Sequence, residues 1–123
     1  LHLSIRRQRQ MCIRDRIQAL AEAVNFAKKS GVPPKDVLEV ISKGAAQSWQ
    51  MENRWESMVD NEYDFGFAVD LMVKDLEIIS EFSKRIGADI SLTDTIKTYY
   101  NELQEMGAGS LDTSCLLKRL DQS

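Results

Sequence analysis

The most regular hydrophobic pattern in this 123-residue chain lies in residues 67–86, FAVDLMVKDLEIISEFSKRI. The stretch contains neither proline nor glycine and is bordered by Gly66 and Gly87, so the sequence predicts one long helix. At about 100° per residue, one half of the helical wheel is largely apolar, and we expect that half to face the core. The apolar half contains Phe67, Leu71, Met72, Leu76, Ile78, Ile79, Phe82 and Ile86, and the other half contains Val69, Asp70, Val73, Glu77, Ser80, Glu81 and Lys84.

Two charged residues interrupt this apolar half. Asp75 projects into its middle, between Phe82 and Ile86, and Lys74 lies at its edge. A carboxylate on a core-facing surface is costly unless it finds a partner, so this Lys-Asp pair is the first candidate for a functional site. The alternative is that Lys74 is a solvated edge residue and that Asp75 caps the backbone of an adjoining helix.

Shorter helices are predicted on both sides of the long one. The signals are Pro34 in a first turn, Ser48 as an N-cap, Ser91 with Asp94 as an approximate capping box, and Asp112 or Thr113 as a final cap. The expected helices cover about 17–30, 34–43, 48–60, 91–106 and 113–120. Because no strand-like alternation occurs, the sequence predicts an all-α single domain of five or six helices with one long central helix.

Composition narrows the class of protein. A hydrophobic content of 43% and a charged content of 28% are typical of a soluble globular domain. No apolar run approaches the roughly 20 residues of a membrane span, so we expect no membrane contact and a cytoplasmic location. Cys12 and Cys115 give no metal spacing, and His2 is the only histidine, so we expect no metal centre.

Residues 1–16 differ from the rest of the chain. They contain five of the eight arginines, although the chain as a whole has a net charge of −3. The hexapeptide 11–16, MCIRDR, resembles a translated transposon-end adapter used to build sequencing libraries, and the segment has no clean helical period. We therefore predict that residues 1–16 are adapter-derived and that 17–123 form the domain. The competing interpretation is a basic arm that binds nucleic acid.

Five runs, taken in order, resemble one known family. They are Gln18-Ala-Leu-Ala-Glu-Ala23, Lys28-Lys-Ser-Gly31, Val37-Leu-Glu-Val-Ile41, Ser48-Trp-Gln-Met-Glu-Asn53 and Gly66-Phe-Ala-Val-Asp-Leu-Met-Val-Lys-Asp-Leu76. Together with the ending 110–117, SLDTSCLL, this ordered set is similar to the C-terminal helical domain of the β-hydroxyacid dehydrogenases. That family includes 3-hydroxyisobutyrate dehydrogenase and tartronate semialdehyde reductase, and its helical domain resembles that of 6-phosphogluconate dehydrogenase.

The resemblance implies oxidation of a small 3-hydroxy acid to its semialdehyde with NAD or NADP. It also implies a separate Rossmann domain, whose GxGxxG phosphate loop this chain does not contain. The helical domain is then expected to close the cleft over cofactor and substrate and to form a homo-oligomer interface. We expect no nucleic acid partner.

The resemblance also assigns site residues. Lys74 and Phe67 are expected at the cofactor, and Asp75 and Trp49 in the substrate cleft. Trp49 and Trp55 together resemble a wall of the cofactor or substrate site. The competing interpretation places both in the core, where aromatic side chains at helical spacing usually lie. The family's catalytic lysine aligns with Arg6 and its asparagine with Gln10, so no catalytic residue is assigned and the chain alone is expected to be inactive.

A different class of function remains open. The chain could be a non-catalytic all-α module that associates through an exposed apolar face. Both interpretations predict self-association, and a dinucleotide-binding unit encoded ahead of residue 17 would distinguish them in favour of the enzyme.

Overall fold

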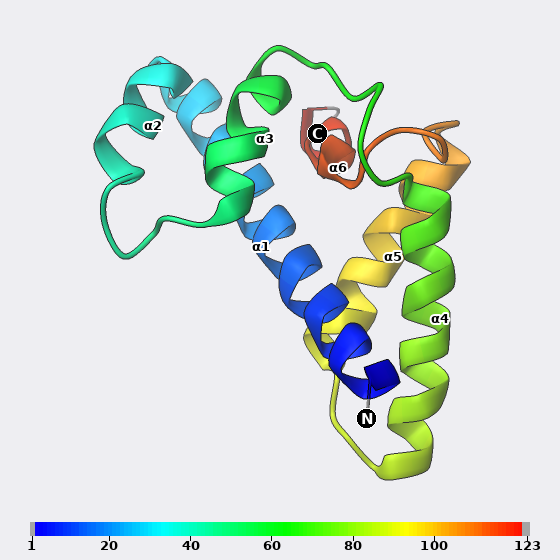
Figure 1. Ribbon diagram of the computed structural model, residues 1–123. Helices are drawn as coiled ribbons and strands as arrows, with labels where there is room; N and C mark the ends of the chain where they lie inside the picture. The colour runs from blue at the N-terminus through cyan, green and yellow to red at the C-terminus, as the bar shows by residue number, and fades with distance from the viewer. Residues whose placement is uncertain (1, 122–123) are drawn as a thin grey trace.

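The protein folds as a bundle of helices around one core. The structure, a computed structural model, describes the backbone of residues 2–121 and the side chains of residues 5–121. Over this range it contains α-helices, one short 3₁₀-helix and no β-strand (Figure 1). The elements are α1 (His2–Ser30), α2 (Pro34–Ile41), α3 (Trp49–Val59), α4 (Val69–Ile86), α5 (Ser91–Glu105), η1 (Thr113–Cys115) and α6 (Leu116–Asp121). The all-α prediction is confirmed.

Helix α1 organises the bundle. It runs diagonally through the molecule, with α2 and α3 around its C-terminal half and the α4–α5 pair beside its N-terminal half (Figure 1). It packs against α6, α3, α5 and η1, and it also contacts α2 and α4. Trp55 and Tyr100 are the largest aromatic side chains that are fully buried between these helices. The prediction of Trp55 as a core residue is therefore correct.

Helix α4 is the predicted long helix, but its buried side differs from our expectation. It begins at Val69, two residues later than predicted, and ends at Gly87, whose φ of 72° a residue with a Cβ rarely adopts. The buried side consists of Val69, Met72, Val73, Leu76, Ile79, Ser80 and Ser83. Leu71, Ile78 and Ile86 are exposed instead. The predicted core-facing half is therefore correct for Met72, Leu76 and Ile79 and wrong for Leu71, Ile78 and Ile86.

The helix caps follow the sequence signals in two of three cases. Ser48 accepts a hydrogen bond from the Met51 amide at 3.1 Å, and Asp112 accepts one from the Ser114 amide. The capping box at Ser91 was wrong, because α5 has Ile90 at its N-cap position without a side-chain cap. Asp94 instead accepts a hydrogen bond from Ser80 Oγ at 3.0 Å, which joins α5 to α4.

Residues 1–16 were expected to lack a regular period, but residues 2–16 form the N-terminal part of α1. Arg14 is fully buried there, and its Nη2 donates to Thr93 Oγ1 at 2.8 Å. The segment thus packs on α5 in this structure. The adapter origin of residues 1–16 stays a prediction.

Main-chain hydrogen bonds tie the start of α4 to the segment before η1. The Val69 amide donates to Leu111 O and the Asp70 amide to Gly109 O, both at 2.9 Å. The Thr113 amide donates to Phe67 O at 2.9 Å, and Ala68 pairs with Asp112 in an antiparallel bridge. These bonds fix the position of the chain at the N-terminus of α4, where the candidate site lies.

Candidate functional site

A small cleft lies between α1, α3, the start of α4 and η1. Its volume is about 210 Å³, which is below the roughly 300–1,000 Å³ of pockets for drug-sized ligands, so it suits a small molecule. Two predicted site residues, Trp49 and Phe67, line it together. The other lining residues are Gln10, Ile13, Gln50, Arg54, Met72, Asp112 and Thr113.

Trp49 stands at the edge of this cleft because it is the first residue of α3. Its side chain is 58% exposed, so the alternative that placed it in the core was wrong. The indole contacts the guanidinium of Arg54, whose carbon lies 5.1 Å from the ring centroid. The Phe65 ring also lies near this guanidinium, with its centroid 4.9 Å from the same carbon. Two cation–π contacts thus help to hold the Arg54 side chain in place.

Phe67 is half-buried and is held through its backbone. Its amide donates to Asp112 Oδ1 at 2.9 Å, while its carbonyl accepts from the Thr113 amide. The aromatic ring can therefore contact the cleft while both of its peptide groups stay paired. This arrangement makes Phe67 a fixed part of the cleft wall.

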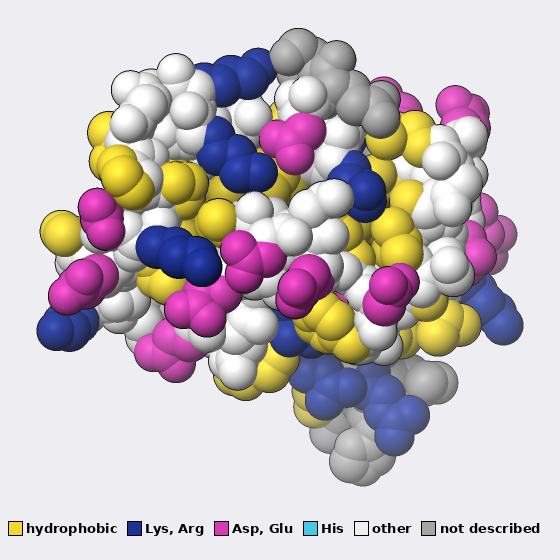
Figure 2. All heavy atoms as spheres, turned by 90° about the horizontal axis from the view of Figure 1, so that it is seen from above, with side chains coloured by type: hydrophobic (Ala, Val, Ile, Leu, Met, Phe, Trp, Pro, Cys, Tyr) yellow, Lys and Arg dark blue, Asp and Glu magenta, His cyan; other side chains and the backbone are white. Residues whose placement is uncertain are grey.

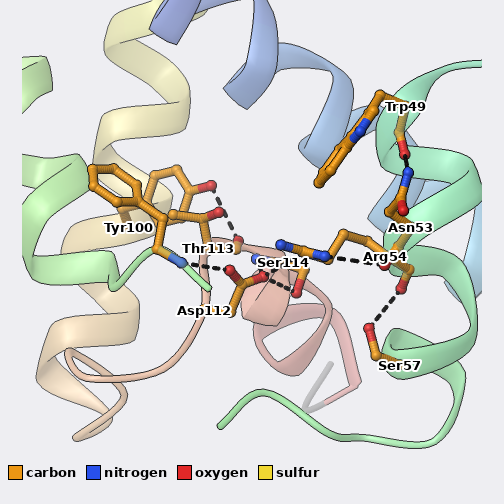
Figure 3. A network of polar contacts seen from close by, with 9 residues as sticks. Trp49, Asn53, Arg54, Ser57, Tyr100, Asp112, Thr113 and Ser114 are labelled. Atoms are coloured by element: carbon orange, nitrogen blue, oxygen red, sulfur yellow. Dashed lines mark hydrogen bonds and ion pairs between the residues drawn. The ribbon is translucent and has the colours of Figure 1, made fainter. Parts of the chain in front are cut away.

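The carboxylate of Asp112 is the centre of a polar network (Figure 3). Asp112 is 1% exposed and accepts from the amides of Phe67 and Ser114, from Ser114 Oγ and from Arg54 Nε, which lies 3.1 Å away. Each acceptor bond compensates part of the cost of burying the charge. Nearby, burial raises the pKa of Tyr100, whose hydroxyl donates to Thr113 O at 3.1 Å.

Gln50 is the unpaired polar residue of the cleft. It is 8% exposed, and its side-chain oxygen has no hydrogen-bond partner among the described residues. Leaving a buried polar group unpaired costs about 1–3 kcal/mol. A ligand in the cleft can supply the missing partner.

Lys74 and Asp75 lie on the outer side of α4 and do not line this cleft. Lys74 is exposed and Asp75 is half-exposed, and neither forms a side-chain hydrogen bond or ion pair with another residue that the structure describes. The alternative that made Asp75 a backbone cap is therefore wrong. Leu71 and Ile78, three residues before and four after Lys74, are 52% and 41% exposed. Lys74 thus lies on an exposed apolar stripe, defined here as Leu71, Ile78 and Ile86 together with the half-buried Phe82, which is available to a partner surface or ligand.

The two positions of α1 that align with the family's catalytic lysine and asparagine lie in different surroundings. Gln10 is half-buried and lines the cleft beside Trp49 and Phe67. Arg6 is exposed one turn earlier on α1. A guanidinium stays protonated at neutral pH, so Arg6 cannot take the role of a lysine that exchanges a proton.

Sequence reasoning missed Gln50 and Arg54 and described Asp112 only as a helix cap. The signal for the first two was their spacing, because residues four apart on α3 share a face and both follow Trp49. No sequence signal joined Asp112 to Arg54, since the two are 58 residues apart.

Charged and apolar groups are mixed over the surface. Figure 2 shows hydrophobic side chains exposed between Lys, Arg, Asp and Glu on the viewed face. Among the residues described, none form a group of three or more His, Cys, Asp or Glu able to hold a metal ion. In the same part of the chain, every helix is too short or too polar to cross a membrane.

The chain belongs to a family of NAD-binding helical domains from dehydrogenases. Residues 8–120 match the family model described as NAD-binding of NADP-dependent 3-hydroxyisobutyrate dehydrogenase. The match begins within residues 1–16 and ends in α6. It confirms the expected family, and the fold agrees with it.

Individual relatives support this assignment. The chain is 48% identical over 114 residues to an uncharacterized oxidoreductase of Shewanella frigidimarina, covering 93% of the chain and 39% of the relative. It is 32% identical to L-threonate dehydrogenase of Haemophilus influenzae, covering 83% of the chain and 34% of that protein. A solved 3-hydroxyisobutyrate dehydrogenase of Salmonella typhimurium superposes with a TM-score of 0.86 at 30% identity, covering 94% and 40%. The chain therefore spans about two fifths of the length of such relatives.

Proposed function

We propose that this chain is the helical half of the active site of an NAD(P)-dependent dehydrogenase that acts on a small 3-hydroxy acid. The observation that carries the proposal is the cleft shared by Trp49, Phe67 and Gln10. Two of these positions were assigned to the site from resemblance, and the third aligns with the family's asparagine. They come from three separate helices or helix ends, so their meeting in one small cleft supports a common role.

Lys74 and Phe67 are the residues that we assign to the cofactor. The ammonium of Lys74 is exposed and unpaired among the described side chains. It can therefore donate hydrogen bonds to the amide or hydroxyl oxygens of a nicotinamide nucleoside. The chemistry that a nicotinamide cofactor supplies when bound is acceptance of a hydride.

The remaining residues act on the substrate side. Trp49 lines the cleft beside Phe67, and we assign Asp75, which lies outside the cleft on α4, to the same substrate side. Oxidation of the alcohol also needs a group that takes the hydroxyl proton. The aligned position holds Arg6, which cannot do so, and we propose that the 123-residue chain alone has no dehydrogenase activity.

We further propose that the exposed apolar stripe of α4 (Leu71, Ile78, Phe82 and Ile86) is covered in the assembled enzyme. Ile86 is 59% exposed and Ile78 is 41% exposed, so burying the stripe against a second surface is favourable. This supports the expected homo-oligomer. The same stripe would serve the alternative function of a non-catalytic interaction module.

A chimera separates these two functions. Residues 17–123 replace the matching part of the full-length Shewanella frigidimarina relative, so that the relative supplies everything before position 17. We expect the chimera to reduce NAD or NADP in the presence of small 3-hydroxy acids, while the purified 123-residue chain shows no turnover. A folded chimera without activity would contradict the proposal and favour the interaction module.

The chimera also tests Lys74. The variant Lys74→Met should raise the cofactor KM about tenfold or more, because a charge-assisted hydrogen bond is lost. Lys84→Met, which changes an exposed lysine on the polar side of the same helix, is the control and should leave the KM unchanged.

A further inference from the structure

The cleft offers both polar and apolar groups to a ligand. Two residues of α3, Gln50 and Arg54, lie one helical turn apart and form a polar wall, whereas Trp49, Phe67 and Met72 add apolar surface to the lining. A hydrocarbon ligand would leave the polar wall without a partner. The cleft therefore suits a small molecule that carries both apolar and polar groups.

Gln50 is the group on the polar wall that needs a ligand. Its side-chain oxygen is buried without a partner among the described residues, and the residue lines both this cleft and an adjoining cavity of about 420 Å³ beside Trp49. A carboxamide can present either an acceptor oxygen or a donor nitrogen. A hydroxyl group of a ligand can pair with either end of this carboxamide, because a hydroxyl both donates and accepts hydrogen bonds.

The charge of the wall favours a neutral ligand group over a second carboxylate. Arg54 already gives its Nε to Asp112 and its Nη1 to Asn53 O at 3.1 Å. The Asp112 carboxylate, which is also part of the cleft wall, compensates the charge of Arg54. On the cleft side of Gln50, an additional carboxylate would approach Asp112, which is unfavourable. The cations Arg9 and Arg16 line the adjoining cavity and not this cleft.

We propose that Gln50 is a specificity-determining residue that selects 3-hydroxy acids bearing a further hydroxyl group, by pairing with that hydroxyl inside the cleft. The inference rests on the proposed function, since it assumes that a 3-hydroxy acid occupies this cleft. It adds that hydroxylated acids bind better than aliphatic acids of the same carbon number.

Binding to the 123-residue chain tests the inference directly. The indole N–H signals of Trp49 and Trp55 are followed by NMR in the ¹⁵N-labelled chain during titration with L-threonate or 3-hydroxyisobutyrate, which both have four carbons. Trp55 is buried, with its Nε1 donating to Pro34 O at 2.9 Å, so it serves as the internal reference. We expect L-threonate to shift the Trp49 signal with the lower Kd.

The variant Gln50→Met should raise the Kd of L-threonate about tenfold, which is the effect of one hydrogen bond, and change that of 3-hydroxyisobutyrate less than about twofold. Removing an unpaired buried amide is not expected to unfold the chain, and Gln50→Leu provides a second test of the same change. Gln18→Met is the matched control, because Gln18 is also buried with an unpaired oxygen but does not line the cleft. It should leave both Kd values unchanged.

The outcomes are distinct. Three results would overturn the role of Gln50 while leaving the proposed function intact. Gln50→Met could change the Kd of both acids equally, it could change neither Kd, or the unmodified chain could bind 3-hydroxyisobutyrate more tightly than L-threonate. If neither acid shifts the Trp49 signal and the chimera is inactive, the proposed function itself fails, and the inference fails with it.

Discussion

Arg54 Nε donates a hydrogen bond of 3.1 Å to Asp112 Oδ2, although the two residues are 58 positions apart. The bond joins α3 to the segment that precedes η1, and Asp112 carries the connection on to the amide of Phe67. The Asp112 carboxylate therefore links the positions of the two aromatic residues of the cleft. It holds Phe67 directly through the Phe67 amide, and it holds Trp49 indirectly through Arg54.

Removing the cation of this pair should be costly. Arg54→Ala leaves Asp112, which is 1% exposed, with a buried charge and one fewer partner. We expect a loss of about 3 kcal/mol in the free energy of unfolding, measured by urea denaturation. Lys35→Ala removes the cation of the exposed Lys35–Asp60 pair and should cost less than about 1 kcal/mol. Equal losses in the two variants would show that the Arg54 pair is not a structural link.

Gly66 should not accept a side chain. Its φ is +74°, and a Cβ atom there would lie 2.1 Å from Asp112 Oδ1. Gly66→Ala is therefore expected to lower the free energy of unfolding by more than about 1 kcal/mol. Gly44→Ala is the control, because a Cβ at that position meets no atom within 4 Å. The thermal unfolding midpoint of Gly66→Ala should be clearly lower than that of Gly44→Ala. An unchanged midpoint for Gly66→Ala would contradict the predicted clash with Asp112.

Alkaline pH should destabilise the fold through Cys115. Burial, followed by the charge of Asp112, raises the pKa of this thiol from 9.0 to about 12. The thiol of the unfolded chain ionises first, so stability is retained below about pH 9 and falls as the pH rises toward 12. The maximum slope for one group is about 1.4 kcal/mol per pH unit.

Urea midpoints measured at pH 8 and at pH 10.5 test this prediction. Cys115→Ala should reduce the difference between the two midpoints. Part of the difference will remain, because burial also raises the pKa values of Tyr63 and Tyr100. A pH dependence identical to that of the unmodified chain would show that Cys115 ionises normally.

Self-association should depend on the exposed apolar stripe of α4. Replacing both Leu71 and Ile78 by Gln is expected to raise the dissociation constant of self-association at least about tenfold. The reason is that association then no longer transfers two large apolar side chains from water into the interface. Sedimentation equilibrium measures the change. Val40→Gln is the control, since Val40 is 78% exposed on α2. If the Leu71 and Ile78 double variant associates as tightly as the Val40→Gln control, the interface does not include this stripe.

The helices could be predicted from the sequence because their signals are local. Ser48, Pro34 and Gly87 each act within one turn of the helix they begin or end. The edges of the buried side of α4 could not be predicted. Val69 and Val73 are apolar, as are Leu71 and Ile78, and only the packing of α4 against its neighbours decides which pair is covered.

The candidate site was predictable only in part, for the same reason. Trp49 and Phe67 were assigned by resemblance to a family motif, and the structure places both in one cleft. Gln50 and Arg54 escaped notice because glutamine and arginine in a helix are usually solvated. Only the folded chain brings Asp112 to Arg54 and buries the side-chain oxygen of Gln50 in the cleft without a partner among the described residues.

The main-chain bonds between the start of α4 and residues 109–113 have a consequence for how such a domain changes over time. Phe67 is held through its amide and carbonyl, so any residue with an ordinary peptide group can be held there in the same way. New side chains at position 67 can therefore reshape the ligand wall without loosening the scaffold. Substitutions that change substrate preference therefore cost the least folding stability at a position of this kind.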